Sequence, residues 1–593
     1  MQRSRLTRRE VLGKGLRLLA VAGPSVLLAT ACGQQAAPAK PAESKPAESK
    51  PAAAAKPAET KPAAPAAATT APAVKTESKP AESKPAAAAK PAGGESPAMT
   101  KPGETPKRGG TLNAAVQNDF VTMWPAITTG PTASVCYDAL IKWRVGDDGR
   151  WGPQPGLAES WELSDNAAVF KIRKGVKFHD GSDVNADAVA WNVTTWMTHP
   201  KSLAKSQLLV VNKEKPAEVV DDYTVKINLT APAGSLLAVL SDAQRETGIA
   251  SKVAGEKLGD ELGLQAVGSG PFIFQEWQSG SQLIVNKNPN YWDKAPDGSP
   301  YPYLDKIHYR FVPDDSVRFV ELRSGSADIA QLIRGRDVPA AKADPNLLYW
   351  ENPSQGRLYR FFFNAQKPPF KDNLNLRKAI QYAIDREAMA KAVGGGVGTA
   401  NKYDLTEGTL GYDPSVPFYS FDLDKAKAAM KESGVTTPFN VRLTVISREA
   451  DQQQAQMIQQ MLDKIGIKVD IEALERVAWG QKVRQANDFE MATQQTSTPL
   501  DPDAIALAWA PDGTAAYVRP NEPAIQDCLK EGRTTYDVKK RQETYVKCQT
   551  LMQETAWWGH MWIQPYNYLL NKKVKITSPF YTEDWREWSI WLA

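Results

Sequence analysis

The sequence lacks the short motifs that mark most enzymes and metal sites. It has four cysteines and four histidines in 593 residues, with no CxxC pair and no HExxH. These absences exclude zinc-ribbon, thioredoxin-like and zincin interpretations. GxSxG, a Walker A loop and a GxGxxG after a strand are also absent, which removes common hydrolase and nucleotide-binding signatures. We therefore expect a protein that is not an enzyme and needs no cofactor or metal.

Cysteine is also too scarce for a disulfide framework. Apart from Cys32, the chain contains Cys136, Cys528 and Cys548. In an oxidising compartment, Cys528 and Cys548 could pair across two adjacent helices. Two buried thiols are the interpretation that we favour over this pairing.

The part of the chain that should fold has no excess of positive charge. Residues 1–33 and 34–108 each carry a net charge of +5, so residues 109–593 carry −5 of the total of +5. Nucleic-acid binding would need a basic patch or stripe on a folded domain. We expect no nucleic-acid partner.

The N-terminus has the features of an export signal. Arg8 and Arg9 precede an apolar run of about sixteen residues, Leu16–Ala31, which is shorter than the roughly twenty residues of a spanning helix. The arginine pair resembles a twin-arginine signal, although Val11 stands where phenylalanine is usual. The run ends in "LATAC", similar to a bacterial lipobox, so we predict a signal peptide at 1–32 and lipidation of Cys32.

Residues 33–108 form a low-complexity segment rich in Ala, Pro, Lys and Glu, with "KPAESKPAAAAK" repeated. Almost no large apolar residue is present to offset the entropy of ordering it. Frequent proline favours extended polyproline II conformations. We predict a disordered tether between an anchored Cys32 and a distant folded part.

Residues 109–593 alternate between strand and helix patterns. A strand is expected at Gly356–Asn364 and a hairpin turn near Gly280. Residues 375–393 are predicted as one amphipathic helix, and another begins at the capping residue Asp422. Such alternation predicts an α/β fold.

Long blocks of this region keep one order along the chain. They are "GGTLNAA" (109–115), "LAESWELSDNAAVFKIRKGVKFHDGSDVNADAV" (157–189), "VGSGPF" (267–272), "VNKNPNYW" (285–292) and "RFFFNAQKPPFKDNLNLRKAIQYAIDREAM" (360–389). In sequence and order they resemble the extracytoplasmic solute-binding proteins of family 5, the peptide-binding components of ABC importers.

The resemblance implies a two-lobed α/β periplasmic-binding-protein fold with a hinge and an extra subdomain on lobe I. The chain would cross between lobes near Arg360–Ala365 and again near Ile563–Tyr568. The implied divisions are lobe I at 109–362 with a subdomain at about 150–265, lobe II at 363–565, and a return to lobe I at 566–593.

The resemblance also implies the partners and the location. A peptide-like solute would bind between the lobes, and ABC permease and ATPase subunits would receive it. The protein would be a monomer outside the cytoplasm, on the outer face of the cell membrane, and would touch the membrane through its lipid anchor alone. An oligosaccharide is the alternative ligand, and a surface receptor without an importer is an alternative role.

Several aromatic and charged residues are candidate ligand contacts by the same resemblance. Trp479 lies where relatives place a ligand-contacting tryptophan, and Arg484 follows on the same segment as a partner for a ligand carboxylate. Trp124 follows the first strand, where family loops face the cleft. Trp509 and Tyr517 follow the "DPD" turn.

The stretch "QQTSTPLDPDA" bears on the ligand class. Relatives anchor a peptide α-amino group with an aspartate shortly before the Asp-Pro pair. That position is Thr498 here, or Pro499 in a shifted alignment, and neither is a carboxylate. Either Asp501 substitutes for it, or the ligand is not a peptide with a free amine. Gln495, Thr496 and Thr498 offer neutral donors and acceptors, which suit a hydroxyl-rich ligand.

The same stretch raises an alternative of another class, a secreted hydrolase that uses Asp501 and Asp503. Paired carboxylates can act as acid and base. Carboxylates separated by one proline usually point apart, and no second acid is marked elsewhere. We therefore disfavour hydrolysis.

Overall fold

The computed structural model describes residues 96–593 except for 121, 128–132, 147–149, 244, 296, 332–334, 510–517 and 581–584. The predicted signal peptide, Cys32 and the tether up to residue 95 lie outside this range. Within the described ranges, no helix has the length and apolar character needed to span a membrane.

Most strands belong to one sheet that runs through both lobes. They are β1 (Thr111–Val116), β8 (Phe272–Gln278), β9 (Gln282–Lys287), β10 (Lys306–Phe311), β11 (Ile329–Gln331), β12 (Leu347–Phe363), β13 (Thr399–Ala400), β14 (Phe439–Ile446), β15 (Ile467–Leu474), β16 (Met491–Ser497) and β17 (Trp558–Asn571). Among the described residues the order is β15-β14-β16-β12-β17-β11-β1-β10-β9-β8, with β13 also paired to β17. Gly280 has a φ of +76° at the predicted turn between β8 and β9, as glycine readily allows.

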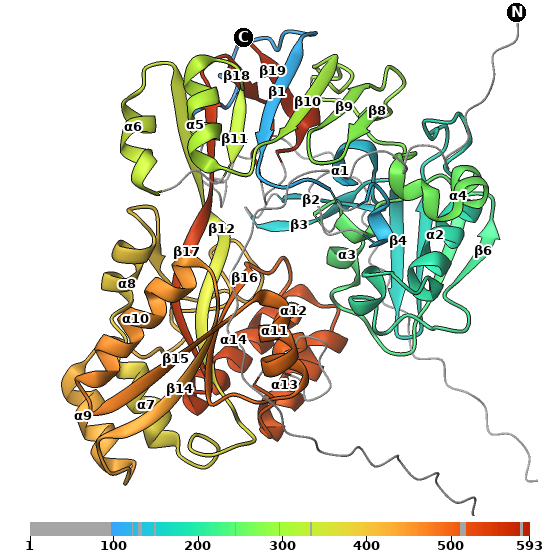
Figure 1. Cartoon of the computed structure of the whole chain (residues 1–593). Helices are drawn as coiled ribbons and strands as arrows, with labels where there is room; N and C mark the ends of the chain where they lie inside the picture. Colours follow the sequence, from blue (N-terminus) through green and yellow to red (C-terminus); the bar gives the residue numbers. More distant parts are fainter. Residues whose placement is uncertain are drawn as a thin grey trace, which may run out of the picture. The chain divides into compact units, whose positions relative to one another are not determined.

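The long strands β12 and β17 join the two lobes. They pair with each other on both sides of a register break between Glu351 and Gly356. Before the break they lie next to β11, and after it next to β16 (Figure 1). Trp350 belongs to the first-lobe core, whereas Tyr359 belongs to the second. We therefore propose that the first crossing lies at residues 351–356, earlier than the sequence suggested.

The first lobe carries a separate four-stranded sheet and a helix. These are β4 (Ala158–Ser164), β5 (Ala167–Ile172), β6 (Ala217–Asp221), β7 (Thr224–Asn228) and α2 (Ala186–Thr198). The strand order is β4-β5-β7-β6, and α2 packs against β6 and β7. Asn185 caps α2 by accepting a hydrogen bond from the Ala188 N–H at 2.9 Å.

The last part of the predicted tether is ordered, which corrects its expected boundary. Ala98 is fully buried, and Met99 forms a bridge to Ile576 at the end of β18 (Val574–Ile576). The N–H of Thr100 donates to the Ile576 carbonyl at 2.9 Å. Apolar side chains and backbone pairing thus attach residues 96–100 to the first lobe.

Helices surround the second-lobe part of the sheet. They are α7 (Leu374–Ala383), α8 (Arg386–Val393), α9 (Leu423–Glu432), α10 (Glu449–Asp463), α11 (Arg476–Trp479), α12 (Asp503–Trp509), α13 (Pro523–Thr534) and α14 (Val538–Thr555). The predicted cap at Asp422 is confirmed. The single helix predicted over 375–393 is wrong, because Asp385 interrupts it and caps α8 through the Ala388 N–H.

The thiol interpretation of Cys528 and Cys548 is also wrong. The two residues form a disulfide between α13 and α14. These helices pack against each other and place both cysteines in their shared core, with a Cα–Cα distance of 5.6 Å that a disulfide requires. Cys136 is a buried free thiol.

Candidate functional site

A cavity of about 380 Å³ lies between the two lobes, a volume typical of small-molecule sites. Its first-lobe wall includes Leu209, Val210, Ser235, Val239 and Glu246. Its second-lobe wall follows the end of β16 into α12 and includes Ser497, Thr498, Leu500, Asp501, Asp503 and Arg533. Gln355 and Tyr566, from the strands that cross between the lobes, complete it.

Asp501 holds the turn that forms the second-lobe wall. Its carboxylate accepts the N–H of Asp503 at 2.9 Å, a local bond that aspartate favours where a helix starts. Arg541 of α14 donates two hydrogen bonds to Asp501 at 2.8 and 2.9 Å. Burial alone lowers the pKa of Arg541, but the Asp501 charge outweighs it and raises that pKa. Asp501 is therefore already engaged by a cation of its own chain.

Asp503 contacts both lobes. It accepts hydrogen bonds from Nε of Arg533 at 2.9 and 3.1 Å and from the first-lobe Ser235 hydroxyl at 2.9 Å. Burial raises the pKa of Asp503; Arg533 opposes this shift, and the like charge of Asp501 adds to it. This carboxylate thus joins the wall of the second lobe to a loop of the first.

Further contacts close one side of the cavity, which we call the rim: residues 233–235 of the first lobe and 533–536 of the second. The N–H of Gly234 donates to the Arg533 carbonyl at 2.7 Å. The Tyr536 hydroxyl accepts the N–H of residue 233 at 3.1 Å. The rim consists of hydrogen bonds between segments that are far apart in sequence.

A second side, next to the strands that cross between the lobes, is formed by residues 355–356 with Gln564 and Thr498, and we call it the hinge side. The Thr498 hydroxyl donates to Oε1 of Gln355 at 2.5 Å and accepts the Gly356 N–H at 3.2 Å. A Cβ at Gly356 would clash with the Gln564 carbonyl. Thr498 therefore connects the cavity wall directly to the crossing strands.

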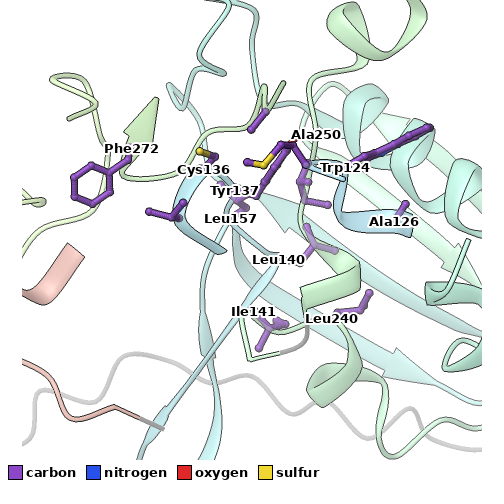
Figure 2. Packing of buried hydrophobic residues seen from close by; sticks show 14 of the residues in the cluster. Trp124, Ala126, Cys136, Tyr137, Leu140, Ile141, Leu157, Leu240, Ala250 and Phe272 are labelled. Atoms are coloured by element: carbon purple, nitrogen blue, oxygen red, sulfur yellow. The ribbon is translucent and has the colours of Figure 1, made fainter. Parts of the chain in front are cut away.

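Thr498 and Asp501 lie on the cavity wall, whereas the three predicted tryptophans do not. Trp124 is 5% exposed in the first-lobe core (Figure 2). Trp479 and Trp509 are 3% and 1% exposed in the second-lobe core. The structure corrects their expected position from cleft to core, because these large apolar side chains fill the interior. A role of these tryptophans in ligand binding stays a prediction, and their buried positions do not support it.

The remaining predicted contacts face other partners or lie outside the described residues. Gln495 accepts a hydrogen bond from Arg448 at 2.5 Å, and Thr496 accepts one from Arg360. The Arg484 side chain is exposed. Tyr517 lies outside the described ranges. Their ligand roles likewise stay predictions.

Sequence reasoning missed the first-lobe half of the site. Ser235 ends the stretch "TAPAGS", whose proline and glycine mark a loop. Nothing in the sequence signals that this loop meets Arg533 and Asp503. Gln355 and Tyr566 were also missed, because they lie within strand patterns.

The arrangement does not suit acid–base catalysis by the two aspartates. Each carboxylate is bonded to its own arginine, Asp501 to Arg541 and Asp503 to Arg533. Arg541 and Arg533 occupy the carboxylate oxygens that would exchange a proton with a substrate. Burial still raises the pKa of Asp503, but its oxygens are already taken. Among the described residues, no cluster of three or more His, Cys, Asp or Glu could hold a metal ion.

Comparisons with known proteins agree with this architecture. The sequence model of the bacterial extracellular solute-binding proteins, family 5 (middle region), matches residues 152–516. The dipeptide-binding protein of Escherichia coli (strain K12) is 29% identical over 464 residues, which cover 72% of this chain and 84% of that protein. The glutathione-binding protein GsiB of the same strain is 29% identical over 460 residues, covering 75% and 87%.

A solved structure has the same fold. The ABC transporter-associated periplasmic binding protein DppA from Helicobacter pylori, in complex with peptide STSA, matches with a TM-score of 0.68 and 26% identity. The match covers 82% of this chain and 98% of that one. The predicted two-lobed fold is confirmed. Because the family model matches more than half of the chain, the chain belongs to the bacterial extracellular solute-binding proteins of family 5, the solute-binding components of ABC importers.

Proposed function

We propose that this protein captures a peptide-like solute in the cavity between its lobes and delivers it to an ABC import permease. The observation that carries the proposal is the cavity itself, which has walls from both lobes, a hinge side and a rim. A ligand that contacts both walls favours the closed arrangement, and a membrane partner can recognise that arrangement. Two relatives are named for the binding of dipeptide and of glutathione, and these names support a peptide-like ligand.

An oligosaccharide is the second candidate ligand. It is supported by the neutral hydroxyl and amide groups of Ser497, Thr498, Gln355 and Tyr566 on the wall. Such groups exchange hydrogen bonds with sugar hydroxyls without any change of charge.

The role that we propose is binding without catalysis. The arginine-bound state of Asp501 and Asp503 supports this proposal. We also propose that Cys32 carries a lipid, that export uses the twin-arginine route, and that the monomer works on the outer face of the membrane. Cys32→Ser should move the protein from the membrane fraction to the soluble extracytoplasmic fraction, and retention in the membrane would contradict the anchor.

Binding is tested by calorimetry on the full chain with di- to pentapeptides and with α- and β-linked oligosaccharides. We expect one reversible site per chain and no product after long incubation. Val239→Arg fills the cavity and should abolish binding. Val253→Arg is the matched control, because Val253 is 57% exposed on the same lobe, outside the cavity wall. Unchanged binding in Val239→Arg, or ligand turnover, would contradict the proposal.

A further inference from the structure

Arg533 is the one basic side chain among the described residues that line the cavity. It lies in the last turn of α13, and its hydrogen bonds to Asp503 both come from Nε. A guanidinium carries five N–H donors, of which Nε supplies one. Nη2 is buried and has no hydrogen-bond partner among the described residues. The ion pair with Asp503 therefore leaves part of this guanidinium unsatisfied.

The unsatisfied Nη2 has an energetic consequence for closure. A buried donor that has lost water without gaining an acceptor carries the full cost of its desolvation, and this cost is larger when the group is charged. The closed arrangement of the lobes includes that cost. Because arginine only donates, the group that removes the cost must supply a lone pair. An oxygen of a ligand would do so and would thereby favour the closed arrangement.

The rim gives a ligand access to this group. The Gly234 N–H donates to the Arg533 carbonyl, and the Ser235 hydroxyl donates to the Asp503 carboxylate that also holds Nε. Both donors belong to the first lobe, so they leave Arg533 when the rim opens. Even with the rim closed, the Arg533 side chain is 27% exposed. A ligand can meet the guanidinium in the open arrangement and be enclosed against it when the lobes close.

We propose that Arg533 determines specificity in this cavity: its terminal amino group donates a hydrogen bond to an oxygen of the ligand, from a carbonyl or a carboxylate group. This inference rests on the proposed function, because it concerns the ligand of the same cavity. A carboxylate would form the stronger, charge-assisted bond, but the negative charges of Asp501 and Asp503 oppose it. A carbonyl oxygen forms a weaker bond without that repulsion.

Calorimetry on the full chain tests the inference with two probes that differ at one group. Alanyl-alanine ends in a carboxylate and alanyl-alaninamide in a neutral amide, and both contain a carbonyl oxygen. Arg533→Gln removes the guanidinium and should weaken binding at least about tenfold, which is about 1.4 kcal/mol. A loss confined to alanyl-alanine identifies a carboxylate as the acceptor, whereas an equal loss for both probes identifies a carbonyl oxygen.

Two further variants separate the ligand bond from the ion pair. Asp503→Asn breaks the same pair but leaves the guanidinium in place, and asparagine can still accept the Ser235 hydroxyl. The probes should therefore bind to Asp503→Asn at least about tenfold more tightly than to Arg533→Gln. Lys530→Met removes one positive charge from an exposed position of α13 outside the described wall. It should bind both probes as the wild type does.

The outcomes separate this inference from solute capture. If Arg533→Gln binds both probes within about threefold of wild type, the inference is overturned while solute capture stands, because a water molecule would then be enough to satisfy Nη2. Equal losses in Arg533→Gln and Asp503→Asn also overturn it, because the ion pair would then be the cause. If neither probe binds to the wild type but another solute does, the inference fails and solute capture stands. If no solute binds, both fail.

Discussion

The two sides of the cavity are built differently. The hinge side is continuous chain: β12 and β17 run through both lobes, and Thr498 bonds to Gln355 and Gly356 beside them. The rim is made of hydrogen bonds between residues 233–235 and 533–536. Rim contacts can break without unfolding either lobe, whereas the hinge side cannot separate. We therefore expect changes at the hinge side to alter stability, and changes at the rim to alter closure and ligand affinity.

The largest effect is expected at the ion pair between Arg541 and Asp501, which supports the cavity wall. Arg541→Met leaves Asp501 buried without its cation, which should lower the free energy of unfolding by about 3–5 kcal/mol. Urea unfolding followed by circular dichroism measures it. Lys539→Met is the control on the same helix, since that side chain is 87% exposed and should change stability little. A loss below about 1 kcal/mol would show that the pair is not structural.

At the hinge side, Gly356→Ala should cost about 1–3 kcal/mol, because the added methyl group meets the Gln564 backbone and forces β12 and β17 apart. Thermal and urea unfolding measure the loss. Gly152→Ala is the control, because a Cβ there meets nothing within 4 Å. If both variants are equally stable, the strands at the crossing have more freedom than their packing indicates.

At the rim, Gly234→Ala places a Cβ 2.6 Å from the Thr535 carbonyl of the other lobe. The lobes can relieve this clash by opening, so we expect unfolding stability within about 0.5 kcal/mol of wild type. Ligand affinity should fall about tenfold, which is about 1.4 kcal/mol. Calorimetry measures the affinity, and small-angle scattering measures the opening. Gly480→Ala, with open space at its Cβ, should change neither. A destabilised Gly234→Ala with normal affinity would remove the distinction between rim and hinge side.

The smallest effect is a pH dependence at Asp503, which bonds to Ser235 and Arg533 of the rim. Burial raises the pKa of Asp503 above its ordinary value near 3.8, so the folded state holds this proton more tightly than the unfolded state. The resulting stability is fully present below that ordinary value and is lost as pH rises through the raised pKa. Asp503→Asn lacks this contribution. The difference in unfolding free energy, wild type minus Asp503→Asn, should therefore decrease with rising pH, and an increase would contradict the direction of the shift.

Much of the fold was predictable because its signals are local. Asp422 caps a helix through a residue three positions away, and glycine at residue 280 marks a turn between two neighbouring strands. The order of long sequence blocks along the chain also identified the family and its two lobes. Local patterns failed where two local signals compete, as at Asp385, whose capping preference divides a continuous amphipathic pattern.

The site was less predictable because its contacts join distant parts of the chain. Thr498 and Gln355 are 143 positions apart, and Ser235 and Asp503 are 268 apart. Composition cannot show that Arg541 rather than a ligand occupies Asp501, nor that Trp479 and Trp509 fill the core. The sequence by itself determined the α/β class and the family. Tertiary packing alone decided which polar groups remain for a ligand, because each carboxylate binds the partner that folding brings within reach.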